Sequence, residues 1–186
     1  MERDSRGIAV TVAIVAAIGI SLLAMLAVMN RRDQIVGLNE DIQYDDFAFS
    51  VLAVREAHSL GSAEYQTNAQ GVYWIVTLKI VNHAKRVDYK FKRSSPVLIE
   101  ASGRELRPSP IGQQALESAS GLRCSEPIPA GASCTTEVVF DVPANARVSS
   151  LRISEGGLAG DILEVIFFGK KRIELGTVEG KLLKRS

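Results

Sequence analysis

The sequence predicts an all-β fold, an antiparallel β-sandwich preceded by one N-terminal transmembrane helix. Three observations lead to this prediction. Residues 7–29 contain no charged side chain. From residue 45 onward, apolar side chains recur at every second position, as in strands that bury one face. Clusters of Gly, Pro, Ser and Asn separate these stretches, and no long apolar stripe with helical spacing follows the first segment.

The apolar run over residues 7–29 is long enough to cross a bilayer. As a helix it measures roughly 35 Å at 1.5 Å per residue, and a hydrocarbon core needs only about 20 residues. A helix also pairs its own backbone groups, which lipid cannot do. Arg3 and Arg6 precede the run, and Arg31 and Arg32 follow it. We therefore expect a short N-terminal tail, residues 1–6, followed by a membrane span.

A cleaved signal peptide is the competing interpretation of this run. It requires a shorter apolar stretch and small residues at positions −3 and −1 of a cleavage site. The run ends in LLAMLAVMN, which offers only poor pairs such as Leu22 and Ala24. No cysteine lies nearby for lipid attachment. An uncleaved anchor is therefore the preferred interpretation.

Cys124 and Cys134 are the only cysteines of the chain. Cytosolic thiols stay reduced, whereas exported domains use disulfides. A bridge between them would close a loop of about 11 residues and stabilise the fold by about 2.8 kcal/mol. The alternative is two unpaired buried cysteines, which behave as small hydrophobic residues. We expect the disulfide, which would tether the loop containing Cys124 to a strand that begins at Cys134.

The expected location follows mainly from this cysteine pair. The positive-inside rule barely favours a cytoplasmic N-terminus, because two arginines stand on each side of the span and only the amino terminus adds positive charge to the N-terminal side. An oxidised pair favours a domain outside the cytoplasm. The expected location is the cell membrane, with a single pass, a cytoplasmic N-terminus and an extracytoplasmic (periplasmic or extracellular) C-terminal domain.

The strands are expected to follow a polar linker, residues 30–44. In the strand over 71–82, Val72, Trp74 and Val76 alternate with Tyr73 and Thr77, so Trp74 should face the core and Tyr73 the solvent. The stretch 109–121 could hold one or two helical turns. The other predicted strands are 45–54, 86–93, two around the turn at Ser102 and Gly103, 133–143, 150–154, 162–168 and 171–175.

About eight short strands without interleaved helices predict an immunoglobulin-like β-sandwich over residues 45–176, followed by a basic C-terminal tail over 177–186. Two stretches carry a resemblance: VYWIVTLKIVN, which ends at Asn82, and PIPAGASCTTEVVFDVP, which ends at Pro143. Together they resemble a family of exported bacterial immunoglobulin-like domains of unknown function. Members of that family are attached to the membrane through a lipoprotein-type or single-pass anchor. The resemblance covers about residues 45–154 and implies a fold and an extracytoplasmic location, but no reaction.

No pattern in the sequence predicts a catalytic, cofactor or metal site. Lys and Arg together number 22 and Asp and Glu 21, so the charge gives no bias toward nucleic acid. His58 and His83 stand apart, and no Gly-x-Ser-x-Gly motif accompanies them. The glycines at 156, 157 and 160 lack the spacing of a phosphate-binding loop.

Two functions fit these observations. The first is a membrane-anchored, extracytoplasmic, non-catalytic binding module that contacts the membrane through residues 7–29 and a protein partner through its loops or a sheet edge. The alternative is an accessory single-pass subunit of a larger membrane complex. Ala13, Ala17 and Ser21 recur every four positions, and small residues at that spacing favour helix packing in lipid. An enzyme is not expected.

Overall fold

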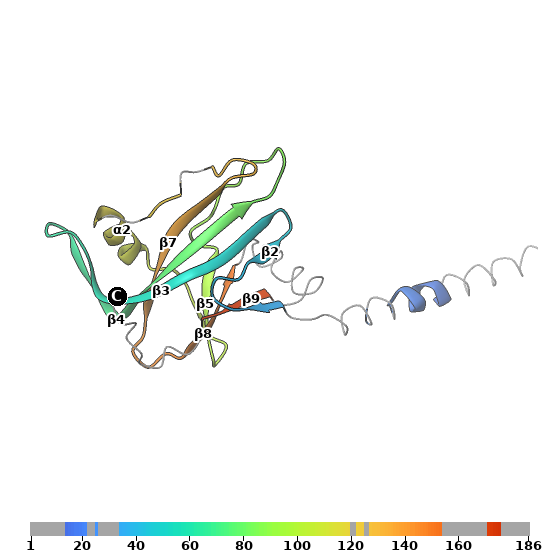
Figure 1. Cartoon of the computed structure of the whole chain (residues 1–186). Helices are drawn as coiled ribbons and strands as arrows, with labels where there is room; N and C mark the ends of the chain where they lie inside the picture. Colours follow the sequence, from blue (N-terminus) through green and yellow to red (C-terminus); the bar gives the residue numbers. More distant parts are fainter. Residues whose placement is uncertain are drawn as a thin grey trace, which may run out of the picture.

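The computed structural model describes residues 14–21, 25, 34–119, 122–124, 127–153 and 171–175. Within these residues the strands form two packed sheets (Figure 1). Sheet A contains, in spatial order, β1 (Gln34–Val36), β9 (Lys171–Glu174), β8 (Val148–Ile153), β5 (Pro96–Glu100) and β6 (Glu105–Leu106). Sheet B contains β2 (Ile42–Tyr44), β3 (Phe47–Gly61), β4 (Gln66–Asn82) and β7 (Ser133–Val142). The predicted two-sheet sandwich is confirmed.

The centre of sheet B is the long hairpin of β3 and β4. Its turn requires glycine at Gly61, which has φ 123°, because a Cβ there would lie 1.8 Å from the carbonyl oxygen of Tyr65. On its other edge β4 pairs antiparallel with β7, placing Trp74 beside Phe140. β4 therefore carries neighbours on both sides over most of its length.

The main core fills the space between the two sheets. The inward residues of β4 obey the predicted alternation, and Trp74, Val76 and Leu78 are all buried there. From sheet A, Leu98 and Leu151 meet them and are fully buried. Alternation of this kind is what two sheets packed face to face require.

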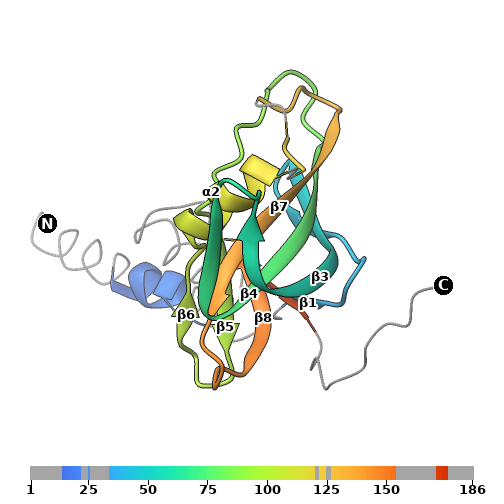
Figure 2. The same ribbon diagram turned by 90° about the vertical axis from the view of Figure 1, so that its left-hand side faces the viewer.

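A second core covers the outer face of sheet B. The helix α2 (Pro110–Ala119) lies against β3, β4 and β7 (Figure 2). Its Ala115 and Leu116 pack in one cluster with Tyr73 and Val139. The prediction that Tyr73 faces solvent is therefore wrong, because a helix longer than the one or two turns expected from residues 109–121 covers that face.

The sandwich begins earlier than the sequence predicted. Residues 34–44, assigned to the linker 30–44, contain β1 and β2. β1 pairs with β9 in parallel, so that Gln34 lies opposite Lys171, and the sandwich is not entirely antiparallel as predicted. The polar composition of this segment hid both strands, since each is only 3 residues long and β1 is mostly exposed.

The predicted strand over residues 86–93 is also wrong. That segment makes a single bridge, between Tyr89 and Ile128, and otherwise runs outside the sheets. The fully buried Asn82 explains this course. Its side-chain amide donates to the carbonyl oxygens of Val87 (2.8 Å) and Ile128 (3.1 Å), and it accepts from the Ala84 N–H (3.0 Å). These bonds hold the chain in a turn where the pattern alone suggested a strand.

Part of the predicted membrane span is described. Residues 14–21 and Met25 are helical, and the Ser21 hydroxyl donates to the carbonyl oxygen of Ala17 one turn earlier (2.8 Å). Within the described ranges, no helix is both long and apolar enough to cross a membrane. The rest of 7–29, the predicted strand 162–168 and the predicted tail 177–186 lie outside the described residues.

Candidate functional site

The two cysteines singled out by the sequence are brought together. A disulfide joins Cys124 to Cys134, whose Cα atoms are 5.4 Å apart. Cys134 belongs to the start of β7, and Cys124 is buried beside the main core. The bridge therefore holds the loop after α2 against the edge of sheet B.

A groove with polar side chains in its lining opens at the other end of β7. Its volume is about 550 Å³. Three segments that are distant in sequence form it: the first half of β4, the stretch leading into α2, and the end of β7. The lining residues are Thr67, Asn68, Gln70, Gly71, Tyr73, Arg107, Ser109, Ile111, Asp141, Pro143 and Ala144.

One wall of the groove is fixed by Asp141. Its carboxylate accepts hydrogen bonds from the backbone N–H groups of Gln70 (3.0 Å) and Gly71 (3.2 Å). Only glycine fits at position 71, since a Cβ there would lie 2.2 Å from the carbonyl oxygen of Val142. The close approach of β4 to β7 and the two hydrogen bonds accepted by Asp141 together hold this wall rigid.

The floor of the groove is formed by Tyr73. Its ring is buried under α2, and its hydroxyl reaches the groove, where it donates to the carbonyl oxygen of Asn68 (3.1 Å). The Thr67 hydroxyl oxygen lies 3.3 Å from the hydroxyl oxygen of Tyr73. Two hydroxyl-bearing side chains, Thr67 and Tyr73, therefore belong to the lining of the groove.

The opposite wall is the start of α2. The Ser109 hydroxyl accepts from the Gly112 N–H (3.2 Å), which is the bond made by a helix N-cap. The Ser109 N–H donates to the carbonyl oxygen of Val139 (2.7 Å), so this cap is pinned to β7. The Ile111 side chain is 60% exposed beside it and offers an apolar contact.

Of the two charged side chains that line the groove, one has hydrogen-bond partners among the described residues and the other has none. Asp141 accepts two backbone N–H groups, whereas the exposed Arg107 guanidinium makes no hydrogen bond or ion pair within the described residues. The lining offers groups that can bind a ligand: the Arg107 guanidinium, the hydroxyls of Thr67 and Tyr73, and the apolar side chain of Ile111. Across the described ranges, no group of three or more His, Cys, Asp or Glu side chains could hold a metal ion.

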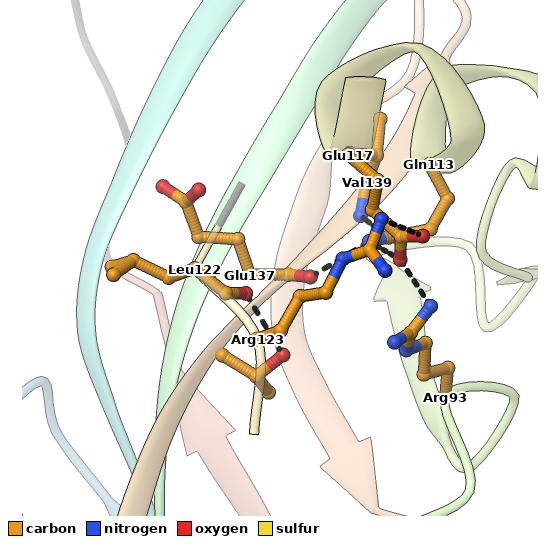
Figure 3. A network of polar contacts seen from close by, with 8 residues as sticks. Arg93, Gln113, Glu117, Leu122, Arg123, Glu137 and Val139 are labelled. Carbon is orange, nitrogen blue, oxygen red and sulfur yellow. Dashed lines mark hydrogen bonds and ion pairs between the residues drawn. The ribbon is translucent and has the colours of Figure 1, made fainter. Parts of the chain in front are cut away.

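A polar network beside the groove holds α2 in place (Figure 3). Glu117 pairs with Arg93 and with Arg123, the latter at 3.0 Å. The Gln113 amide nitrogen donates to Glu117 (3.1 Å) and to the backbone carbonyl of Glu137 (3.1 Å). The network joins the helix to β7 and to the loop of the disulfide, so it supports the groove without lining it.

Sequence reasoning missed this groove. The one available signal was Ser109 followed by Pro110, a helix N-cap followed by the residue favoured at the first helical position. Nothing in the sequence indicated that Asp141 would meet Gly71, because that contact depends on the register between β4 and β7. His58 and His83, considered earlier as isolated residues, do not line the groove.

The sequence of residues 36–162 matches one protein family, described as a domain of unknown function (DUF4352). No curated protein matches the chain. Among solved structures, a secreted protein from Mycobacterium tuberculosis, MPT63, is similar with a TM-score of 0.53 and 13% identity, covering 77% of this chain and 98% of that one.

Two further structures are similar at the level of the fold. The yjhA protein from Bacillus subtilis has a TM-score of 0.52 and 11% identity, covering 75% of this chain and 98% of that one. A conserved hypothetical protein from Bacillus anthracis has a TM-score of 0.50 and 12% identity, covering 63% of this chain and 87% of that one. At these identities the likeness concerns the fold alone.

Proposed function

The chain belongs to the DUF4352 family, and from that premise we propose that it is a non-catalytic, immunoglobulin-like binding module that is anchored in the cell membrane. Residues 7–29 form the anchor, and the sandwich stands outside the cytoplasm. The groove beside α2 takes an extended segment of a partner protein that carries a carboxylate next to an apolar side chain.

The observation that carries this proposal is that Arg107, which has no partner among the described residues, lines the same groove as the exposed Ile111. A guanidinium without a partner recognises a carboxylate with two parallel hydrogen bonds. Ile111 offers apolar contact next to it, and the Tyr73 and Thr67 hydroxyls add hydrogen-bonding groups on the floor. The bonds from Asp141 to the backbone of Gln70 and Gly71 fix one wall, and the bond from the Ser109 N–H to Val139 fixes the other, which lowers the entropy lost on binding.

The location outside the cytoplasm is supported by the disulfide between Cys124 and Cys134, since such bonds persist in oxidising compartments. The similar fold of MPT63, which is described as a secreted protein, is consistent with it. The anchor is supported by the uncharged run over residues 7–29.

Crosslinking in intact cells tests the groove. A photoreactive residue at Ile111 of the full chain is expected to capture one predominant protein neighbour. Arg107→Ala should reduce that capture by about 10-fold or more, the typical effect of removing a charge-assisted contact. Arg147→Ala is the matched control, because Arg147 is also exposed and makes no ion pair within the described residues. Equal capture by both variants would contradict the proposal.

The same experiment separates the module from an accessory subunit. Replacing residues 7–29 by an unrelated membrane helix should leave capture at Ile111 unchanged if the groove makes the contact. Loss of capture with the replaced helix, and no effect of Arg107→Ala, would indicate a subunit that is recognised through its helix. The bond from Ser21 to Ala17 already uses one of the polar groups of that helix internally.

A further inference from the structure

A cationic segment, residues 83–93, follows β4 and runs outside both sheets. Its side chains alternate even though it is not a strand. Tyr89 and Phe91 point inward and are buried in the main core, whereas Lys90 and Lys92 between and after them are exposed. Lys85 and Arg86, earlier in the segment, are exposed as well.

The segment is held firmly. The backbone of Tyr89 exchanges two hydrogen bonds with that of Ile128, at 2.9 and 2.8 Å, and the Tyr89 ring stacks on Phe47 with 4.1 Å between centroids. Asn82 fixes the first turn through the carbonyl of Val87 (2.8 Å). The exposed cations are therefore presented by a fixed backbone.

The positive charge of this segment is not balanced within the described part of the chain. The side chains of Lys85, Arg86, Lys90 and Lys92 make no ion pair or hydrogen bond there, whereas Arg93, at the end of the segment, pairs with Glu117. The single acid of the segment, Asp88, accepts from the Ala130 N–H (3.3 Å). Val87, between the two pairs of cations, is 61% exposed.

A chain of contacts connects the segment with β1, the first described strand after the proposed anchor in the sequence. Gln34, the first residue of β1, pairs with Lys171, whose ammonium lies 4.5 Å from the centre of the Tyr44 ring. The turn after Tyr44 meets the cationic segment, since the His83 N–H donates to the carbonyl oxygen of Asp46 (2.7 Å).

We propose that the cationic segment docks on anionic lipid headgroups at the surface of the bilayer. Four unpaired cations are attracted to such a surface, and Val87 can enter the headgroup region between them. This inference rests on the proposed function for the identity of the membrane, which is the one that holds residues 7–29. It adds an orientation: the groove lies near the start of β4 and the segment follows its end, so docking turns the groove away from the lipid.

The test uses the full chain with Val87→Cys labelled with an environment-sensitive fluorophore. Both native cysteines are in the disulfide, so the new thiol is the single one open to labelling. The labelled chain is reconstituted into vesicles of phosphatidylcholine alone or with about a third phosphatidylglycerol. The emission should shift to shorter wavelength only with phosphatidylglycerol, and high salt should reverse the shift.

Two variants decide whether the cations cause the shift. Replacing Lys85, Arg86, Lys90 and Lys92 together by Gln should abolish it, while replacing the three lysines by Arg should preserve it. The emission of Trp74 monitors folding in both variants. An identical shift with neutral lipid, or in the Gln variant, would overturn the proposal. So would an emission shift that appears only when an acidic protein is added and does not depend on the lipid composition.

Failure of the anchor would be seen separately. Alkaline carbonate releases a chain that does not span the bilayer, and such release would contradict the anchor over residues 7–29. The docking segment would still be tested in that case, because the fluorophore at position 87 reports contact with anionic vesicles added to the released chain. A shift with added phosphatidylglycerol vesicles would support docking, and its absence would overturn it.

Discussion

The side-chain amide oxygen of Gln113 accepts a hydrogen bond from the backbone N–H of Val139, 3.0 Å away. The amide nitrogen of the same side chain donates to the carbonyl oxygen of Glu137 (3.1 Å), and the Ser109 N–H donates to that of Val139 (2.7 Å). The helix thus occupies the hydrogen-bonding positions of a neighbouring strand along the edge of β7. Unpaired strand edges are sites of aggregation, and this one is covered.

Gln113→Ala is expected to lower the free energy of unfolding by about 1–3 kcal/mol, because one N–H and one C=O of β7 lose their partners. It should also increase self-association through the opened edge. Denaturation followed by the fluorescence of Trp74 measures the first effect, and size-exclusion chromatography measures the second. Gln114→Ala is the control, since Gln114 is the exposed next residue of the same helix. Equal loss in both variants would contradict this function of Gln113.

The sequence predicted sheet B better than its surroundings. Alternation identified the inner face of β4, and the presence of two cysteines only ten positions apart indicated the bridge between Cys124 and Cys134, because both signals lie within one segment or one short loop. It could not identify Tyr73 as buried, because that depends on where α2 packs, over 30 residues later. A period-two pattern shows which faces of a strand are apolar, but a tyrosine side chain is found on both buried and exposed faces because its ring is apolar and its hydroxyl is polar.

The groove was hidden for a related reason. Asp141 and Gly71 are brought together by register, and Arg107 comes from the connection that leads into α2. Each of these residues has an ordinary local explanation as a turn or surface residue. Only their convergence in space makes a site, and no local pattern reports convergence.

Asn82→Ala is expected to cost about 2–4 kcal/mol of unfolding free energy. The variant leaves two carbonyl groups, those of Val87 and Ile128, without their donor in a buried setting. Chemical denaturation monitored by Trp74 emission measures the loss. The exposed Asn145, which bonds no other described side chain, provides the comparison, and Asn145→Ala should change stability by less than about 0.5 kcal/mol. A loss below 1 kcal/mol at Asn82 would show that water replaces the amide.

Removal of the disulfide is expected to lower stability by about 2–3 kcal/mol, as a loop of this length predicts. The loop should remain in place when reduced, because the carbonyl oxygen of Leu122 accepts from the Glu137 N–H (3.2 Å) and from the Thr136 hydroxyl (3.3 Å). Thermal unfolding with and without reductant measures the difference. The Cys124→Ser, Cys134→Ser double variant should unfold at the same temperature as the reduced protein, and reductant should not change that temperature. Reaction of both thiols with maleimide before reduction would exclude the bridge.

Gly112→Ala tests how closely α2 approaches sheet B. In an unrestricted helix this change stabilises by about 1 kcal/mol. Here the new Cβ would lie 2.8 Å from Cγ1 of Val139 and 2.9 Å from Cε1 of Tyr73, so the helix must move away from both. We expect a net loss of about 1–3 kcal/mol in the free energy of unfolding, opposite in sign to the helix propensity.

A double-mutant cycle isolates the cause of that loss. Val139→Ala removes the nearer of the two contacting atoms, so the combined variant should be more stable than the sum of the single losses by about 0.5–3 kcal/mol. Denaturation of the four proteins under one condition supplies the coupling energy. Binding of a partner in the groove should also weaken, because the start of α2 forms one wall of the groove. Crosslinked capture at Ile111 should therefore fall in Gly112→Ala and partly recover in the double variant. Strict additivity would mean that α2 lies farther from Val139 than the 2.8 Å contact requires.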